Sequence, residues 1–170
     1  MKNCNALHFN HTSFNIFSLA PALDFIKQYR KDGKLNTLWL NSDETAPVGL
    51  VHPDDVGHRA AILLSHDNHG AYNKARYVVN GSDDITGTQI VRLVEDIIGA
   101  KIESVKFRDT SVIDSWAAAV SENKGHILSI KHAPDTAREG KCSVSTTSKE
   151  IYTLAAPKIT PAAWLKTAPE

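Results

Sequence analysis

The stretch from Thr86 to Gly99 constrains the fold most, because it reads as a helix with both ends marked. Thr86 and Gln89 stand at the spacing of a capping box, in which each side chain bonds the other residue's backbone N–H. Gly99 occupies the place where a left-handed residue ends many helices. Between these ends, apolar residues recur at helical period: Ile90, Val91, Val94, Ile97 and Ile98. The sequence therefore predicts a helix that starts at Thr86 or Gly87 and ends before Gly99.

Two β-prone runs flank this helix. Residues 75–79 form the first run, and the pair Asn80 and Gly81 that closes it suits a turn with positive φ. Residues 102–107 form the second run, with apolar side chains that do not alternate strictly. Strand, helix and strand fit the length of one α/β crossover unit, so we predict an α/β fold.

Weaker patterns predict further elements on both sides of this unit. We expect a helix kinked at Pro21, further strands and helices, and a polar, mobile loop. In order, these are the helix over 14–29, strands over 35–40 and 48–51, a helix from Pro53, a helix over 109–120 capped by Ser111, a strand over 126–130, the loop over 132–150, a helix capped by Thr147 that ends at Leu154, and a last helix capped by Thr160.

The helix from Pro53 carries two carboxylates in its first turn. Asp54 and Asp55 suit the positive end of the helix dipole, so we interpret both as caps. The apolar residues behind them predict which face turns inward: Val56, Ala60, Ala61, Leu63 and Leu64.

Composition limits the classes of function. The chain has 170 residues and 42% hydrophobic content, which suits one domain over residues 1–170. Nineteen basic and nineteen acidic side chains cancel, so nothing indicates nucleic acid or an anionic membrane surface. The sequence has no apolar run of about 20 residues. We interpret Cys4 and Cys142 as free thiols in a reducing compartment, and we expect a cytoplasmic protein without membrane contact.

Two segments resemble a known family. YVVNGSDDITGTQIVRLVEDIIGAKIESVKF is similar to the "n-G-x-x-x-T" turn and "l-G" helix end of the NmrA-like branch of the atypical extended short-chain dehydrogenases. PVGLVHPDDVGHRAAILLS is similar to that family's "p-v-x-x-v-x-x-x-D-V-G-x-x-a-a" segment. The resemblance implies a Rossmann-like α/β fold and an oxidoreductase lineage that uses NADP on a small-molecule substrate. It also implies a fungal-type member with a place in secondary metabolism.

The sequence departs from the family where the cofactor would bind. Residues 10–17 match the family's "R-P-x-x-F-m-e-N" turn but keep only its aromatic residue. Glycines never fall at G-x-G-x-x-G or G-x-x-G-x-x-G spacing, which a pyrophosphate-binding turn requires. No tyrosine is followed four residues later by lysine. We therefore expect a partial Rossmann-like domain, the C-terminal half of an NmrA-like fold without the N-terminal dinucleotide-binding half, and no cofactor in the isolated chain.

Histidines offer candidates for chemistry. His8 with His11, and His66 with His69, form H-x-x-H pairs, but neither pair has the helical spacing and third ligand of a zinc-protease motif. We interpret them as surface residues and expect no metal site. His52 follows a predicted strand, where α/β sheets face ligands, although its imidazole can equally cap the next helix.

His11, His52 and Asp109 are the catalytic candidates, and aromatic side chains are the candidates for substrate binding. Phe14 and Phe17 belong to the segment that faces substrate in the resembled family. Trp39 can line a pocket or fill the core.

Three classes of function stay open. The chain can be a shortened oxidoreductase that another chain completes, a regulatory protein like the NmrA-type repressors, or a cofactor-free isomerase or cyclase that uses the substrate lobe. An uncovered sheet edge with Phe9, Phe14, Phe17 and Trp39 predicts a homodimer or another protein partner. The alternative is a monomer in which the helix over 14–29 folds back over that face.

Overall fold

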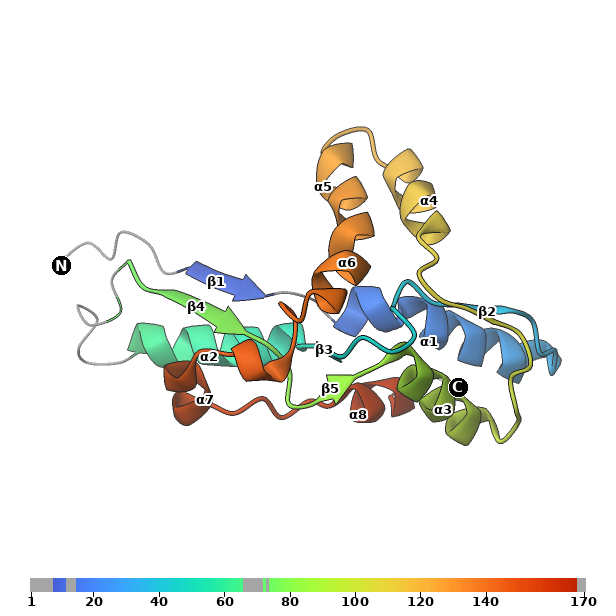
Figure 1. Cartoon of the computed structure of the whole chain (residues 1–170), viewed down its shortest axis with the longest axis horizontal. Helices are drawn as coiled ribbons and strands as arrows, with labels where there is room; N and C mark the ends of the chain where they lie inside the picture. Colours follow the sequence, from blue (N-terminus) through green and yellow to red (C-terminus); the bar gives the residue numbers. More distant parts are fainter. Residues whose placement is uncertain (1–7, 12–14, 66–71, 73, 168–170) are drawn as a thin grey trace.

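Short strands and longer helices are interspersed as far as residue 106, and the described elements after it are helical, which gives a helix-rich α/β fold (Figure 1). The structure, a computed structural model, describes residues 8–11, 15–65, 72 and 74–167. The strands are β1 (His8–His11), β2 (Leu38–Trp39), β3 (Val48–Gly49), β4 (Arg76–Val79), β5 (Asp84–Ile85) and β6 (Val105–Lys106). The helices are α1 (Asn15–Asp32), α2 (Pro53–Ser65), α3 (Gly87–Ile98), α4 (Ser111–Ala119), α5 (Lys124–Ser129), α6 (Ala133–Arg138), α7 (Lys149–Leu154) and α8 (Pro161–Lys166), with 3-10 turns η2 (Ile130–His132) and η3 (Val144–Thr146).

The described strands pair two by two. β1 lies parallel to β4, β2 lies parallel to β6, and β3 lies antiparallel to β5. The predicted strands before and after α3 are therefore present as β4 and β6, but they belong to different pairs. The prediction of one crossover unit is wrong, because β5 lies between β4 and α3 in the sequence and β6 pairs with the distant β2.

Helix α3 confirms the prediction from its two marked ends. Gln89 N–H donates to Thr86 Oγ1 at 3.2 Å, and Thr86 N–H donates to Gln89 Oε1 at 2.8 Å. Gly99 has φ of 70° and donates its N–H to Glu95 O at 2.8 Å. Ile90 and Val94 are buried in the main core. The core extends over several elements: Leu19, Ala22, Ile26, Leu38, Leu40, Leu50, Ile85, Ile90, Val94 and Leu165.

Gly81 has a role other than the predicted one. Neither Asn80 nor Gly81 has positive φ. A Cβ built on Gly81 would lie 2.0 Å from Leu50 O, and Gly81 N–H donates to Gly49 O at 3.0 Å. The end of β4 therefore needs glycine because it lies directly against the backbone that follows β3.

Segments predicted as a strand and a loop are helical instead. Residues 124–129 form α5, which contacts α4 in an arm that projects from the body (Figure 1). Lys131 Nζ and Asp114 Oδ1 join the two sides of this arm at 2.5 Å. The predicted loop over 132–150 contains α6, η3 and the start of α7. Its polar side chains bond to other elements rather than only to solvent, as Thr146 Oγ1 shows by accepting from Asn80 Nδ2 at 3.0 Å.

The prediction of the inward face of helix α2 is right for Leu63 and wrong for Leu64. Asp55, Arg59 and Leu63 are buried, whereas Leu64 is 58% exposed. The Asp55 carboxylate accepts the N–H groups of Lys158 and Ile159 at 3.1 and 3.0 Å, so it does not cap its own helix.

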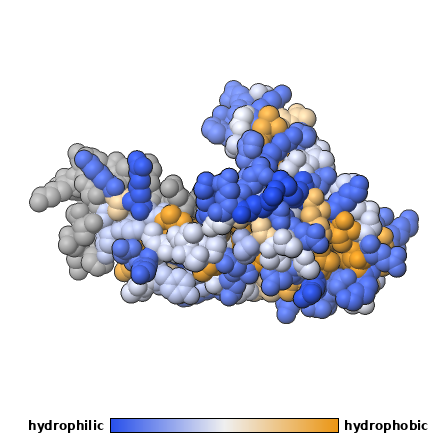
Figure 2. All heavy atoms as spheres, viewed as in Figure 1, coloured by the Kyte–Doolittle hydropathy of each residue, from blue (hydrophilic) through white to orange (hydrophobic). Residues whose placement is uncertain are grey.

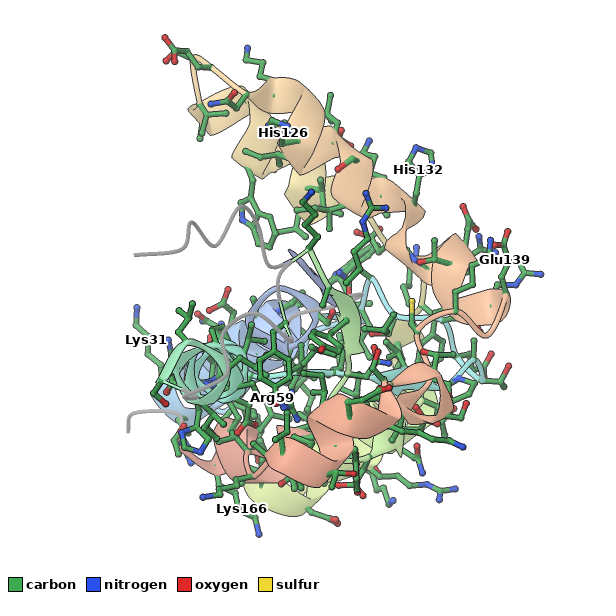
Figure 3. All side chains as sticks on the ribbon, turned by 90° about the vertical axis from the view of Figure 1, so that its left-hand side faces the viewer. Lys31, Arg59, His126, His132, Glu139 and Lys166 are labelled. Atoms are coloured by element: carbon green, nitrogen blue, oxygen red, sulfur yellow. The ribbon has the colours of Figure 1, made fainter. Side chains whose placement is uncertain are left out.

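Arg59 lies between α2 and the C-terminal segment (Figure 3). Its Nε donates to Ala155 O at 2.8 Å, while Nη1 and Nη2 are buried and have no hydrogen-bond partner among the residues that the structure describes. Burial lowers the pKa of Arg59, and the charge of Asp55 opposes this.

Cap predictions at three other helices have mixed outcomes. Thr160 Oγ1 accepts Ala163 N–H at 3.0 Å, as predicted for α8. Thr110 and Ser148, rather than Ser111 and Thr147, occupy the caps of α4 and α7. Among the described residues, no helix has the length and apolar character needed to cross a bilayer.

Candidate functional site

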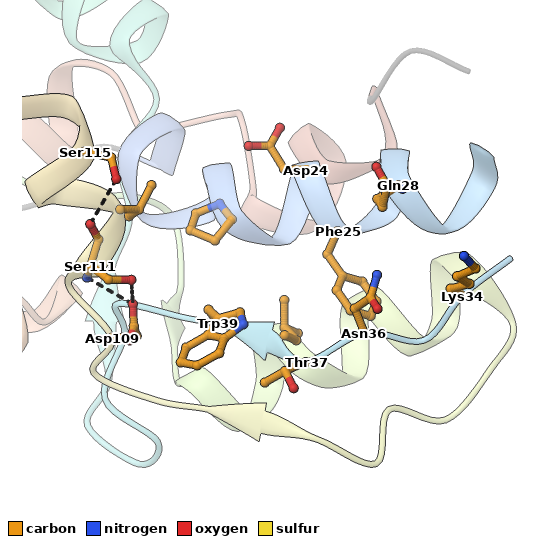
Figure 4. Close-up of a pocket in the computed structure, with 13 residues that line it drawn as sticks. Asp24, Phe25, Gln28, Lys34, Asn36, Thr37, Trp39, Asp109, Ser111 and Ser115 are labelled. Atoms are coloured by element: carbon orange, nitrogen blue, oxygen red, sulfur yellow. Dashed lines mark hydrogen bonds between the residues drawn. The ribbon is translucent and has the colours of Figure 1, made fainter. Parts of the chain in front are cut away.

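A cavity of about 460 Å³ lies between α1, β2 and the start of α4 (Figure 4). Phe25 reaches it from α1, Trp39 from β2, and Asp109 and Ser111 from the segment that leads into α4. Two of the residues that the sequence suggested for function, Trp39 and Asp109, therefore lie at one site although 70 positions separate them.

Trp39 forms the flat apolar side of the cavity. Burial alternates along β2, so Leu38 is in the core while Trp39 is 44% exposed. Lys106, its register partner on β6, places Nζ 4.7 Å from the centre of the indole ring. Phe25, on α1, adds a second ring to the lining. Trp39 therefore lines a pocket rather than filling the core, which leaves an aromatic surface open to a ligand.

Asp109 is held firmly at one end of the cavity. Its N–H donates to Leu40 O at 2.9 Å. Its Oδ1 accepts the Ser111 N–H at 3.0 Å and also the Ser111 hydroxyl. Ser115 follows one turn later and lines the same end (Figure 4). Asp109, rather than Ser111, thus accepts a backbone N–H at the start of α4. It also brings a carboxylate into the cavity.

A basic and amide-rich group lies at the other end. Lys34, Asn36 and Gln28 line the cavity there, and Phe25 and Trp39 lie between the two ends (Figure 4). This end is ordered by Asp32, whose carboxylate accepts Lys34 N–H at 3.0 Å and Gln28 Nε2 at 2.7 Å. These bonds, the one from Lys34 first, lower the pKa of Asp32.

The other sequence candidates lie elsewhere or outside the described part. His52 Nδ1 accepts Asp54 N–H at 3.1 Å, so the imidazole caps α2, which was the structural alternative. It does not line the cavity. His11 belongs to β1 and Phe17 to α1, but their side chains, like all of Phe14, lie outside the described residues.

Sequence reasoning missed Phe25, Lys34 and Ser111. Phe25 carried only a core signal, Ser111 only a cap signal, and Lys34 lies in a polar segment without a motif. Of the histidine pairs, His66 and His69 are not described. In the part of the chain that the structure covers, no three His, Cys, Asp or Glu side chains gather as a metal site would require.

The N-termini of α2 and α3 do not fit a dinucleotide pyrophosphate. The first three N–H groups of α3 are taken by Asp43 O, Glu44 O and Thr86 Oγ1. A Cβ on Gly87 would lie 2.5 Å from Asp43 O, so this glycine serves packing. At α2, the first N–H is taken by His52, and two carboxylates follow. A phosphate needs open N–H groups, and neither helix offers them.

The positive-φ glycines lie at the wrong ends of helices for a phosphate. Gly33, Gly99 and Gly140 follow α1, α3 and α6, where carbonyl groups point outward. Within the part of the chain that the structure describes, the starts of α2 and α3 and the positive-φ glycines therefore do not fit the cofactor that the resembled family uses.

Comparisons with known proteins identify the fold. No protein-family model and no curated protein matches the sequence. Solved structures do match. The chain is similar to an NADPH-dependent quinone oxidoreductase from Escherichia coli, with 15% identity, a TM-score of 0.62, and coverage of 90% of this chain and 51% of that one. It is also similar to a triphenylmethane reductase from Citrobacter sp. complexed with NADP(H). The identity is 12%, the TM-score is 0.63, and the match covers 97% of this chain and 54% of that one.

A nucleoside-diphosphate-sugar epimerase from Staphylococcus aureus is also similar, with 13% identity, a TM-score of 0.56, and coverage of 93% and 50%. The chain thus spans about half the length of each of these proteins. Identities this low show the fold alone. The comparisons confirm the coarser prediction, an α/β fold of the NAD(P)-dependent reductase kind, and add sugar epimerases to the proteins whose fold is similar.

Proposed function

We propose that this chain is a divergent member of the NAD(P)-dependent oxidoreductase lineage that corresponds to the C-terminal, substrate-side half of an NmrA-like fold. Its role is to hold a small-molecule substrate. The observation that carries this proposal is the cavity of about 460 Å³, where Trp39 and Phe25 offer aromatic surface beside the carboxylate of Asp109. Cavities of this size, mostly apolar with a few placed polar groups, are typical of ligand sites.

In this proposal, the dinucleotide binds to the other half of the fold, which another chain supplies. Coverage of about half of each similar structure supports this division. So do the occupied N–H groups at the starts of α2 and α3. We expect calorimetric titration of the purified chain with NADPH to show no binding. A dissociation constant in the low micromolar range, about −8 kcal/mol, would refute this half of the proposal.

The names of two similar structures suggest the kind of substrate. One is a quinone oxidoreductase and the other a triphenylmethane reductase, and both names denote compounds that contain flat six-membered rings. A flat ring can stack on the exposed face of Trp39. We therefore expect 2-naphthol to bind in the cavity.

Substitution of the aromatic surface tests this role. Trp39→Leu removes the stacking surface and is expected to weaken 2-naphthol binding by about threefold to tenfold in calorimetry. Tyr152→Leu is the matched control, because Tyr152 is an equally exposed aromatic residue on α7, at 48%, outside the cavity. Equal binding by wild type and Trp39→Leu would show that the cavity is not the site.

One observation favours a second function, a cofactor-free isomerase or cyclase. Ser111 engages Oδ1 of Asp109, while Oδ2 accepts no hydrogen bond from the described residues and can take a proton. We expect the chain to accelerate exchange of the acidic α-protons of 2-tetralone in D2O, as followed by NMR. Asp109→Asn should abolish the acceleration. An uncatalysed rate with wild-type protein would contradict this function without affecting substrate binding.

A further inference from the structure

We infer that the cavity selects a flat aromatic ligand that carries a hydrogen-bond donor at one end and an anionic group at the other. This inference rests on the proposed function, because it names the class of ligand for the same site. It follows from the way the polar side chains divide between two ends of the cavity with aromatic rings between them (Figure 4).

The donor of the ligand belongs at the Asp109 end. The Asp109 carboxylate is fixed through Oδ1 by the Ser111 N–H and hydroxyl. Ligand binding therefore loses little side-chain entropy in ordering it. Ser111 and Ser115 add hydroxyl groups at the same end, and the Ser115 hydroxyl donates to Ser111 O at 3.5 Å. A carboxylate accepts hydrogen bonds only, so this end favours an amine or a hydroxyl and repels an anion.

The anionic group belongs at the Lys34 end. Lys34 is exposed, and its Nζ forms no ion pair within the described part of the chain. Asp32 lies near but is engaged by the backbone N–H of Lys34 and by Gln28. Asp24 also lines the cavity, but Figure 4 shows its carboxylate turned away from Trp39. An ammonium ion beside the amide side chains of Gln28 and Asn36 suits a carboxylate or sulfonate.

The middle of the cavity requires a flat and apolar ligand. Trp39, Phe25 and Pro21 line it from two elements, β2 and α1. Figure 2 shows hydrophobic residues at the end of the molecule where Figure 1 places α1 and β2. Leu35 and Trp39 are among the exposed large hydrophobic residues. Lys106 lies over the Trp39 ring but is not part of the cavity lining, so a ligand can use the indole surface that faces the cavity.

A series of naphthalene compounds separates these contributions. We would titrate the full chain with 6-amino-2-naphthoate, which has a donor and an anion at opposite ends, and with 2-naphthylamine, 2-naphthoate and naphthalene-2,6-dicarboxylate. We expect 6-amino-2-naphthoate to bind about threefold to tenfold more tightly than either compound with one polar group. The dicarboxylate should bind most weakly, because one of its ends meets Asp109.

Substitutions assign each preference to its residue. Lys34→Gln should remove the advantage of 6-amino-2-naphthoate over 2-naphthylamine and leave 2-naphthylamine binding unchanged. Asp109→Asn should remove the advantage of 6-amino-2-naphthoate over 2-naphthoate. The asparagine side-chain oxygen can still accept hydrogen bonds from Ser111. Lys166→Gln and Asp83→Asn change equivalent exposed charges outside the cavity and should alter neither preference.

Outcomes of the titration separate this inference from the proposed function. Equal affinity for all four compounds, with weakening by Trp39→Leu, would overturn the two-ended selection and leave the aromatic site standing. No binding of any naphthalene compound would overturn both. Loss of preference in the Lys166→Gln control would show that overall charge, rather than the cavity, selects the ligand.

Discussion

Replacement of Gly81 by alanine should destabilise the chain strongly, because the added methyl group would collide with backbone atoms rather than with a movable side chain. The added Cβ would lie 2.0 Å from Leu50 O and 2.7 Å from Leu50 C, whereas real Cβ contacts essentially never fall below 3.0 Å. The two segments must therefore separate by about 1 Å. Leu50 cannot change rotamer to avoid this contact, since its carbonyl belongs to the main chain.

The loss of unfolding free energy can be estimated from the contacts that are disrupted when the segments at Gly81 and Leu50 move apart. Overpacking of this kind costs about 1–3 kcal/mol. The Gly81 N–H bond to Gly49 O, 3.0 Å long, would be stretched or lost at a buried position, which costs about 1–3 kcal/mol more. The total of about 2–6 kcal/mol is a large share of the stability of a typical domain.

Gly57→Ala is the matched control. Gly57 lies inside α2, is exposed, and has no heavy atom within 4 Å of a built Cβ. Alanine there should stabilise the chain by about 1 kcal/mol, because glycine is a poor helix former. Urea denaturation followed by circular dichroism measures both variants. If Gly81→Ala shifted the midpoint no further than Gly57→Ala does, or in the same direction, the close approach of β4 to the backbone after β3 would be refuted.

Three further predictions concern stability and assembly. Thr86→Ala should lower the free energy of unfolding by about 1 kcal/mol without altering ligand binding, since it removes the α3 cap; an unchanged denaturation midpoint would contradict this. Hydrogen bonds from Lys101 and then from Ile102 N–H lower the pKa of Glu95 below its usual 4.5, so its stabilising contribution is complete above that value and is lost as pH falls through the lowered pKa. The stability difference between wild type and Glu95→Gln should therefore shrink on acidification, and a difference independent of pH would argue against the ion pair. Light scattering should show a dimer that Phe17→Asp dissociates while the fold remains, and a monomeric wild type at high micromolar concentration would exclude this assembly.

Features encoded by neighbouring residues could be predicted from the sequence. The capping box of Thr86 and Gln89, the apolar face of α3 and the end at Gly99 all lie within 14 residues, and all are present. Thr160 before Pro161 was equally local. The reductase-like α/β fold could be predicted as well, because its family resemblance rests on two such local segments.

Features that depend on distant partners could not be predicted. Periodicity predicted Leu64 on the inward face of α2. Asp55 and Arg59 are buried instead, because residues about 100 positions later form hydrogen bonds with them. Residues 126–130 are apolar enough for a strand, yet contact with α4 makes them helical. In the cavity, Trp39 and Asp109 could be named singly, whereas their proximity depends on how β2 and α4 are placed.

The bonds from α2 to the C-terminal segment also bear on the order of folding during synthesis. Asp55 and Lys158 are 103 residues apart, which corresponds to roughly 5–20 s at a ribosomal rate of about 5–20 residues per second. During that interval α2 can form, but its buried carboxylate and guanidinium have not yet received their partners. The nascent chain therefore carries an unpaired charged surface on α2 until residues 155–159 emerge, and a chaperone that binds α2 would have to release it only then.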